Sequence, residues 1–477
     1  MTVLAIDQGT SGTKAIVVDG AGEVLALAEV PVHPRYLPDG GVEQDPGELL
    51  DSVLAAGRQA LEAGGVAVAG VALANQGETV LAWDPSSGRA LGPAVVWQDR
   101  RSEAICAGLR AQEGVADLIA GRTGLMLDPY FSAPKLAWLR ANQTREGVVT
   151  TSDAWLVHHL TGEFVTDVTT ASRSLLLDLD AVAWDDELVR CFGLQDERLP
   201  RLVACDESVG TTTAFGGSIP VAGLIVDQQA ALLAEGCLDV GSAKCTYGTG
   251  AFLLANTGTA ATRSGHGLTT SVAWRTRAGT QYCMDGQVYT AASAIRWLAD
   301  LGIVGDPRDL DGQVAEDAEG VLFVPALAGL AAPWWQPEAR ASLAGLSLAT
   351  TRGGLVRAVL EGIAAQVAAL VEVMDADIGR PIEVLRVDGG LTRSRVLMQA
   401  QADLLQRPVE VYASPHATAL GAAALARLVL APSSTLADVV GHAGPSAAFE
   451  PSWSSDRADE YMGRWRAAVD GSLRGPA

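Results

Sequence analysis

Residues 3–19 have the sequence VLAIDQGTSGTKAIVVD, in which two apolar arms flank a tip of Gly, Thr and Ser. This pattern predicts a strand, a tight polar turn and a second strand. A second segment of the same kind, AKCTYGTGAFLLA, occupies residues 243–255. Two halves that each begin with such a hairpin indicate two lobes of related architecture.

The chain between these hairpins alternates strand and helix signals. Asp45 can cap a helix over residues 46–63, where Pro takes the first helical position. The apolar runs 66–74 and 219–226 predict strands buried on both faces. Residues 102–204 predict mostly helices separated by short polar breaks. The fold class is therefore α/β.

The second half continues in the same way. Residues 355–374 carry apolar side chains at helical spacing, and a short strand over residues 383–387 follows. We expect the lobes to divide near residues 234–241. This gives an N-terminal lobe of residues 1–238 and a C-terminal lobe of residues 239–477.

Composition narrows the class of protein. Of 477 residues, 48% are hydrophobic and 19% are charged, which excludes a disordered or coiled-coil chain. The net charge of −22 repels phosphate backbones and anionic membranes, so we expect neither nucleic-acid nor membrane partners. The six cysteines form no CxxC pair, and the N-terminus lacks the pattern of a secretory signal. We therefore expect reduced thiols and a cytoplasmic protein.

The Gly-rich turns are suited to phosphate binding. Glycine and hydroxyl residues at a hairpin tip let several backbone N–H groups point to one place, where they can bind phosphate oxygens. Residues 9–13 and 248–250 have this composition, and Asp388-Gly389-Gly390 adds a glycine turn at a third strand end. Each turn alone is weak evidence, because Gly/Thr hairpins are common and more often only structural. Together they predict a nucleotide held between two lobes.

Two aspartates lie beside these turns. Asp7 ends the first strand, where its carboxylate could hold a hydrated Mg²⁺ close to phosphates. Asp227 ends a buried strand and begins a helix, where it could accept the proton of a substrate hydroxyl during phosphoryl transfer. A helix cap or turn aspartate is the alternative for either residue. The chain has no Walker A sequence, which argues against a P-loop enzyme.

Beyond these physical signals, the chain from Leu4 to about Leu430 resembles the FGGY family of carbohydrate kinases, and most closely its glycerol-phosphorylating branch. The resemblance implies two actin-like (ribonuclease-H-like) lobes around a cleft, ATP with Mg²⁺ as cofactors, a small polyol or sugar as substrate, and a homodimer or homotetramer. It is carried by motifs in both halves, namely Asp7-Gln8-Gly9-Thr10, Asn75-Gln76-Gly77-Glu78-Thr79, Val96-Trp97-Gln98-Asp99-Arg100-Arg101, residues 128–136 (DPYFSAPKL), residues 227–232 (DQQAAL), residues 247–254 (YGTGAFLL) and residues 386–390 (RVDGG).

The resemblance also implies roles for individual positions. Asp227 matches the general base, and Asp7 matches the Mg²⁺-associated carboxylate. Positions that touch substrate hydroxyls or carbons in the family match Gly77, Glu78, Tyr130, Asp227, Gln228 and Phe252. Positions that touch the nucleotide match Thr10, Ser11, Lys14, Gly248, Thr249, Ala292, Arg296, Gly390 and Ser394.

Some positions depart from the family pattern. Relatives that act on glycerol have an arginine where this chain has Gly77, so we expect lost hydrogen-bond donors, added space and room for a longer polyol or sugar. On this hypothesis an arginine at position 77 should improve activity on glycerol. The alternative is that another residue fills the gap and glycerol remains the substrate. Val226 replaces a family glycine, and Ala292, Arg296 and Ser394 differ from the usual nucleotide contacts.

Two other functions compete with a kinase. A non-catalytic sensor or scaffold could keep the lobes and bind nucleotide or sugar only. An actin-like ATPase that acts on protein clients would leave the polar cluster around Glu78 and Tyr130 unexplained. We expect ATP-dependent phosphorylation of a polyol or sugar hydroxyl, because Asp7, Asp227 and both phosphate turns are intact.

Overall fold

The opening hairpin forms as the sequence predicts. In the computed structural model, which describes residues 1–441 and 444–473, the Gly9 N–H donates to the Gly12 carbonyl at 3.0 Å and closes the turn. Two later strands extend the hairpin in parallel on one side, so a six-stranded sheet forms in the order β14-β15-β6-β1-β2-β3. Its strands are β1 (Val3–Gln8), β2 (Gly12–Val18), β3 (Val24–Pro31), β6 (Gly70–Asn75), β14 (Ser208–Thr212) and β15 (Ile219–Val226).

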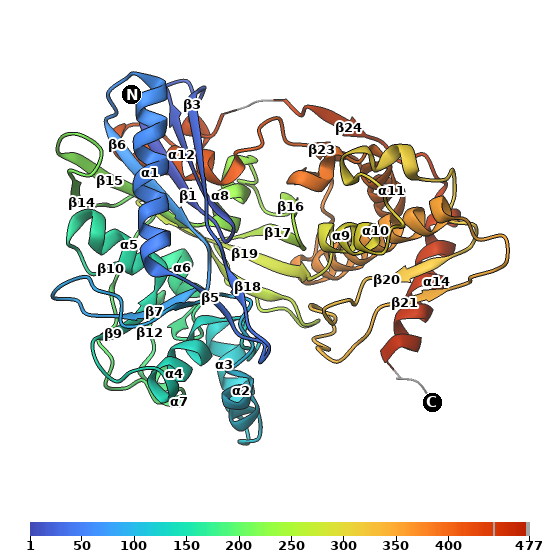
Figure 1. Ribbon diagram of the computed structural model, residues 1–477, viewed down its shortest axis with the longest axis horizontal. Coiled ribbons are helices and arrows are strands. Elements are labelled where there is room, and N and C mark those ends of the chain that lie inside the picture. The colour runs from blue at the N-terminus through green and yellow to red at the C-terminus, as the bar shows by residue number, and fades with distance from the viewer. Residues whose placement is uncertain (442–443, 474–477) are drawn as a thin grey trace.

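The second hairpin starts a sheet with the same internal order. Here too the first strand lies between an antiparallel and a parallel partner, and the seven strands run β18-β19-β17-β16-β22-β23-β24. The strands are β16 (Ala243–Tyr247), β17 (Ala251–Gly258), β18 (Thr269–Thr276), β19 (Gly279–Val288), β22 (Leu385–Asp388), β23 (Val409–Val411) and β24 (Ala447–Phe449). Two sheets with one topology lie side by side (Figure 1), which confirms the actin-like two-lobed α/β fold.

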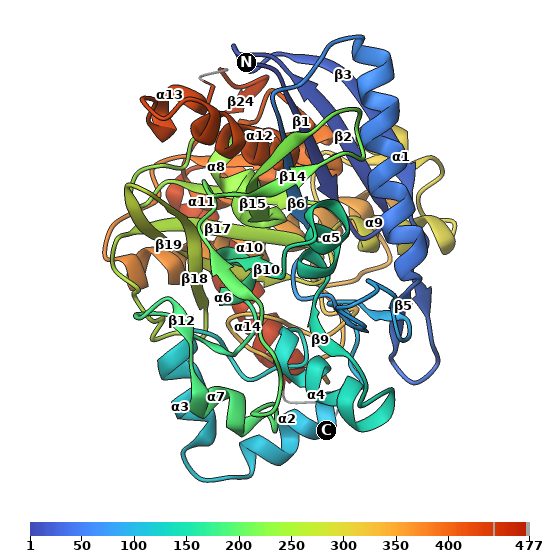
Figure 2. The same ribbon diagram turned by 90° about the vertical axis from the view of Figure 1, so that its left-hand side faces the viewer.

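Alternation along β1 decides which helix covers each face of the first sheet. Leu4 and Ile6 pack with α1 (Pro46–Gly64), while Val3 and Ala5 pack with α12 (Ala417–Leu430). Figure 2 shows the two helices on opposite sides of the strands. The chain therefore returns to its first sheet late in the sequence.

The contact between α12 and α8 (Asp227–Ala234) requires a glycine. A Cβ at Gly421 would lie 1.9 Å from the Ala230 carbonyl oxygen, so any other residue would push the two helices apart. This close approach fixes α8, which begins with Asp227.

The core of the second half surrounds one long helix. α10 (Arg352–Ile378) is apolar and long enough to cross a membrane, but 89% of its most apolar window is buried in the protein, as is typical of a core helix. The other elements of this half are α9 (Ala292–Asp300), α11 (Arg395–Leu405), α13 (Leu436–Val439), α14 (Ser455–Leu473), β20 (Leu322–Val324), β21 (Ser342–Ala344) and the short 3₁₀ helices Pro307–Asp309, Asp311–Gln313 and Gly390–Arg393.

Residues 102–204 contain more strand than the sequence predicts. The helices are α2 (Glu103–Arg110), α3 (Val115–Thr123), α4 (Ser132–Asn142), α5 (Ser152–Thr161), α6 (Val168–Ser172) and α7 (Asp186–Cys191). Between them lie β9 (Val148–Thr151), β10 (Val165–Asp167), β11 (Leu177–Asp178), β12 (Ala183–Trp184) and β13 (Arg201–Val203). β9 joins a five-stranded sheet with β4 (Arg35–Tyr36), β5 (Val42–Gln44), β7 (Val80–Trp83) and β8 (Ala94–Val95), a pairing that its own four residues do not reveal. The six cysteines are free thiols, as predicted.

Candidate active site

The first of the predicted phosphate turns, residues 9–13, is held by side chains from the N-terminal half of the chain. The Trp97 indole N–H donates to Thr10 Oγ1 at 2.9 Å, and the Gln44 amide donates to the Thr10 carbonyl at 2.6 Å. Ser11 is exposed at the tip, and Lys14 is the register partner of Asp7. A cation, a hydroxyl and free turn backbone therefore lie together beside the Asp7 carboxylate.

The second phosphate turn is held by the start of α9. The Ala292 N–H donates to the Gly248 carbonyl at 3.0 Å, and the Ser293 N–H donates to the Thr249 carbonyl at 3.1 Å. A Cβ at Gly250 would lie 2.4 Å from the Val288 carbonyl oxygen, so only glycine fits. At Gly248 the nearest atom to such a Cβ is 3.8 Å away. The turn is thus tight on its protein side and open on the other.

The third turn follows β22 and packs against the second hairpin. Gly389 has φ +96°, and a Cβ there would lie 2.5 Å from the Tyr247 carbonyl oxygen. Gly390 has nothing within 4 Å of the same position, which leaves a cradle open to a ligand. Ser394 uses its hydroxyl to cap α11 and to donate to Asp311 at 2.5 Å, so it faces the protein. Arg296 is exposed on α9.

Carboxylates converge between the turns. Burial raises the pKa of Asp7 to about 6; Asp388 raises it further, and Lys14 opposes the rise. Burial raises the pKa of Asp227 to about 7, with further increases from Asp7 and Glu78. Both aspartates keep some contact with solvent. The positive side chains near these carboxylates do not neutralise them fully, as expected at a place where a cation binds.

The predicted substrate residues lie together, because five of the six line one small cavity. Glu78, Tyr130, Asp227, Gln228 and Phe252 come from both halves of the molecule and meet at this place, which is called the inner cavity below.

Gly77, the sixth residue, has one close neighbour. A Cβ at Gly77 would lie 3.0 Å from Val226 Cγ2, and no other atom of the described residues lies within 4 Å of that position apart from its chain neighbours. Val226 therefore narrows the space on one side of Gly77, and the added space for a longer polyol or sugar stays a prediction.

The loop that carries Tyr130 is fixed by a buried lysine. Lys135 Nζ donates to the carbonyls of Pro129, Tyr130 and Phe131 at 2.8, 2.6 and 2.7 Å. An ammonium has three N–H donors, so each finds an acceptor. Burial lowers the pKa of Lys135 to about 7, although the carboxylates of Glu78 and other neighbours act to raise it. Tyr130 is thereby held at the inner cavity.

Sequence reasoning missed three residues of this site. Arg173 lines the inner cavity and donates from Nε to Glu78 at 2.6 Å and from Nη1 to Asp285 at 2.7 Å. Lys244 is fully buried and donates to Gln228 Oε1 at 2.6 Å. Asp285 and Arg173 gave no local signal, because their partners are distant in sequence. Lys244 was detectable as a lysine among the apolar residues of the second hairpin.

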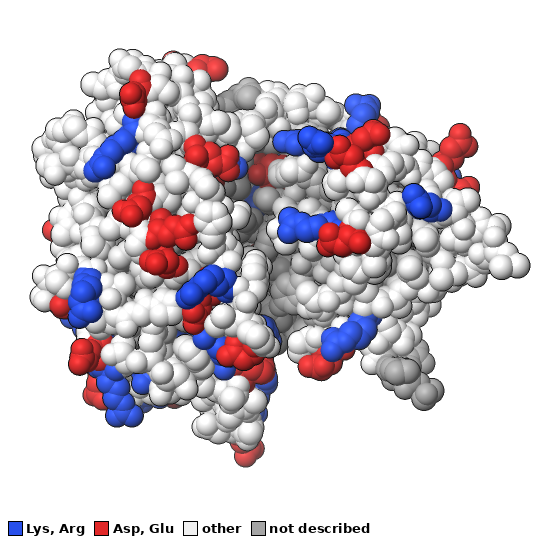
Figure 3. Space-filling model, in the orientation of Figure 1, with Lys and Arg blue, Asp and Glu red and all other residues white. Residues whose placement is uncertain are grey.

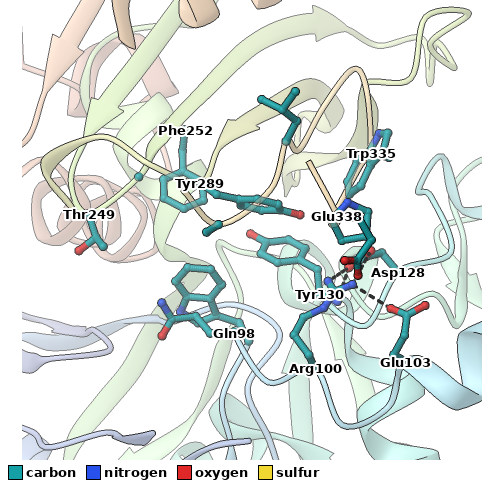
Figure 4. A pocket seen from close by; sticks show the side chains of 15 residues that line it. Gln98, Arg100, Glu103, Asp128, Tyr130, Thr249, Phe252, Tyr289, Trp335 and Glu338 are labelled. Carbon is teal, nitrogen blue, oxygen red and sulfur yellow. Dashed lines mark hydrogen bonds and ion pairs between the residues drawn. The ribbon is translucent and has the colours of Figure 1, made fainter. Parts of the chain in front are cut away.

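A larger cavity of about 590 Å³ lies outside the inner one. It is called the outer cavity below, and Tyr130 and Phe252 line both. In Figure 4 it extends from Thr249 of the second phosphate turn to Arg100, which is bonded to Asp128 and Glu103, with aromatic rings between them. Figure 3 shows a groove between the two halves of the molecule on this face. The second turn and the inner cavity therefore face one space, which Tyr130 and Phe252 connect.

The donor set fits Mg²⁺ held partly by phosphate. No group of three or more His, Cys, Asp or Glu side chains that could enclose a metal occurs among the described residues. Mg²⁺ is usually bound by one or two carboxylates together with substrate phosphates and water. Asp7, beside the first turn and with a raised pKa, suits that arrangement.

Two actin-like lobes with paired Gly-rich turns and a carboxylate facing a polar cavity are the arrangement expected of a phosphotransferase of the actin-like ATPase class. The N-terminal domain of the FGGY family of carbohydrate kinases matches residues 2–234, and the C-terminal domain of that family matches residues 243–429. The chain therefore belongs to the FGGY family of carbohydrate kinases.

Individual proteins agree with this assignment. A glycerol kinase of Aromatoleum aromaticum is 42% identical over 98% of each chain, and one of Thermus brockianus is equally identical over the same shares. Among solved structures, Plasmodium falciparum glycerol kinase with ADP has a TM-score of 0.92 and 32% identity, covering 99% of this chain and 98% of that one. A xylulose kinase from Rhodospirillum rubrum has a TM-score of 0.87 and 25% identity, covering 99% of both.

Proposed function

We propose that this kinase transfers the γ-phosphoryl group of ATP to a hydroxyl of glycerol, with Asp227 as the general base. The observation that carries the proposal is the position of Asp227, which begins α8, lines the polar inner cavity and lies near enough to Asp7, beside the first turn, for that carboxylate to raise its pKa. Relatives that are 42% identical over nearly the whole chain are glycerol kinases. The family and its ADP-bound structural neighbour support ATP as the donor.

The chemical step needs one proton acceptor. Asp227 takes the proton of the acceptor hydroxyl while that oxygen forms a bond to the γ-phosphorus, and the bond from this phosphorus to the β–γ bridging oxygen breaks to release ADP. The Gln228 N–H donates to Asp227 Oδ1 at 2.7 Å and orients the carboxylate. Closure of the two halves would exclude water, which would otherwise compete as the acceptor.

The nucleotide site is built from the three turns. We propose that Thr10, Ser11 and Lys14 bind the terminal phosphates and that Gly248 and Thr249 form the second phosphate contact. Gly390 would lie against the adenosine, with Ala292, Arg296 and Ser394 nearby. Asp7 would hold Mg²⁺, which supplies charge neutralisation on the phosphates when bound.

Acceptor recognition uses directed hydrogen bonds. Glu78 and Asp227 offer carboxylate oxygens to hydroxyl protons. Gln228 has its carbonyl oxygen occupied by Lys244, so its NH₂ group remains for a hydroxyl lone pair. Phe252 supplies an apolar surface for the carbon chain. This mixture suits a small polyol.

A longer polyol or a ketose is the second candidate acceptor. The outer cavity favours it, because its 590 Å³ adjoins the inner cavity at Tyr130 and could hold carbons beyond the third. A non-catalytic sensor has no such support.

We further propose a cytoplasmic homodimer or homotetramer whose chain divides near residue 238. Strand β3 lies at a sheet edge and exposes Leu25 and Leu27, which suits contact with a second copy. Light scattering on the purified protein would measure its mass.

The test of function is an ADP-release assay with the wild-type protein over glycerol, erythritol, pentitols, xylulose and gluconate. We expect ADP release to depend on acceptor, with glycerol giving the highest kcat/KM. Preference for a five-carbon acceptor would favour the second candidate. ADP release without dependence on any acceptor would refute the proposal.

A further inference from the structure

The inner cavity contains a guanidinium whose position the substrate motifs do not indicate. Arg173 follows α6 and has only 5% of its surface exposed, yet it lines the cavity with Asp227 and Phe252. Its charge is matched by Glu78 from the first half of the chain and by Asp285 from β19 in the second. The guanidinium therefore joins the two halves at the bottom of the cleft.

The orientation of this side chain is fixed. Nε donates to Glu78 and Nη1 donates to Asp285, and the guanidinium carbon lies 5.6 and 5.2 Å from the ring centres of Tyr130 and Phe131. Burial alone would lower the pKa of Arg173, but Asp285 and Glu78 outweigh burial and raise its pKa well above the usual range. The group is therefore a permanent, immobile cation.

One nitrogen of Arg173 is left for a ligand. Within residues 1–441 and 444–473, Nη2 has no hydrogen-bond partner. The protein does not fully enclose this atom either, because it is absent from the set of buried polar atoms without a partner. Nη2 therefore reaches open space, and the open space that Arg173 lines is the inner cavity.

The cavity needs such a donor. Its carboxylates can accept from hydroxyl protons, but the lone pairs of a polyol require N–H or O–H donors. Gly77 supplies no side chain, and the neighbouring Val226 is apolar. Gln228, Gln229 and Tyr130 are the other side chains lining the cavity that can donate, and the Gln229 amide already donates to Ser271.

We infer that Arg173 is a substrate-binding and specificity-determining residue, in which two nitrogens are fixed by carboxylates of the two halves and Nη2 donates to a hydroxyl of the polyol. This inference rests on the proposed function. The ligand class it selects is a polyol with at least one hydroxyl besides the reacting one, because one rigid donor can discriminate between acceptors that have and lack that group.

The test compares glycerol with 1,2-propanediol and 1,3-propanediol, each of which lacks one hydroxyl, in wild type and Arg173→Lys. Lysine keeps the charge but cannot form the fork. We expect wild type to prefer glycerol over the less active diol by about 10- to 100-fold in kcat/KM. In Arg173→Lys this preference should fall to about threefold, with the KM for ATP unchanged. If another polyol turns over faster, that polyol and its deoxy analogues replace these three.

A matched control separates binding from folding. Arg140 forms a two-pronged ion pair with Glu197 away from both cavities, so Arg140→Lys should leave the preference as in wild type. Equal loss of kcat/KM with all three acceptors in Arg173→Lys would show a merely structural role and overturn the inference.

Two further outcomes concern a variant that does not fold and a wild-type protein without activity. If Arg173→Lys does not fold, Asp285→Ala takes its place, because it removes the acceptor of Nη1; an unchanged preference in that variant also overturns the inference. A wild-type protein that releases no ADP with any polyol overturns the proposed function, and this inference with it.

Discussion

Replacing Asp227 with asparagine should remove activity and stabilise the protein at the same time. The side chain keeps its shape but can no longer accept a proton, and loss of a general base typically lowers kcat by about 10²–10⁴-fold. Burial raises the pKa of Asp227 to about 7, so the folded protein binds this proton more tightly than the unfolded chain does. The charged carboxylate therefore costs stability, and this cost grows from pH 4 to pH 7 and is constant above.

The size of the stabilisation follows from the pKa. A rise from the ordinary value near 4 to about 7 corresponds to ~4 kcal/mol above pH 7. Contact of Asp227 with solvent reduces this to ~1–2 kcal/mol. For a chain of 477 residues that is about 1–2 °C in Tm.

Calorimetry at pH 8 and pH 4, together with ADP release, would measure both effects. Asp51 is exposed on α1, so Asp51→Asn should change neither. Unchanged kcat in Asp227→Asn, or a Tm at pH 8 below that of wild type, would refute the reasoning.

The remaining predictions concern the cavity wall, the glycine turn and the buried lysine. Gly77→Arg alone should reduce activity on glycerol, because its Cβ would press on Val226, and adding Val226→Gly should restore the activity. The measurement is kcat/KM for glycerol in both variants. Full activity of the single variant would contradict the contact. Gly389→Ala should lose about 2–4 kcal/mol of stability through its positive φ and the close carbonyl. Gly390→Ala should instead raise the KM for ATP about tenfold at unchanged Tm, because its Cβ enters the open cradle; equal melting points in the two alanine variants would argue against this distinction. Lys244→Met should shift the acidic limb of the pH–kcat profile upward, because Lys244 lowers the pKa of Asp227; an unshifted limb would exclude that coupling.

The local residue pattern was enough to predict the strands, turns and helices that depend only on residues close in sequence. Both hairpins, the helix capped by Asp45 and the buried strand before Asp227 were predictable, because alternation, capping and turn chemistry act over a few residues. The short strand β9 was missed because its partners lie elsewhere in the chain. The return of α12 to the first sheet was missed for the same reason.

The same distinction between local and distant causes applies to the residues of the candidate site. Residues in motifs, such as Glu78 and Gln228, were found and do meet in one cavity. Arg173 was not, because its role depends on Asp285, 112 positions away. The contact of Val226 with the position of a Cβ at Gly77 was also missed, because no local pattern indicates it.

A crystal structure with Mg²⁺, a non-hydrolysable ATP analogue and glycerol would test the central claim most directly. The account predicts one glycerol hydroxyl within about 3 Å of an Asp227 carboxylate oxygen and in line with the γ-phosphorus. A hydroxyl bonded elsewhere, with the Asp227 side chain out of reach of both ligands, would contradict it.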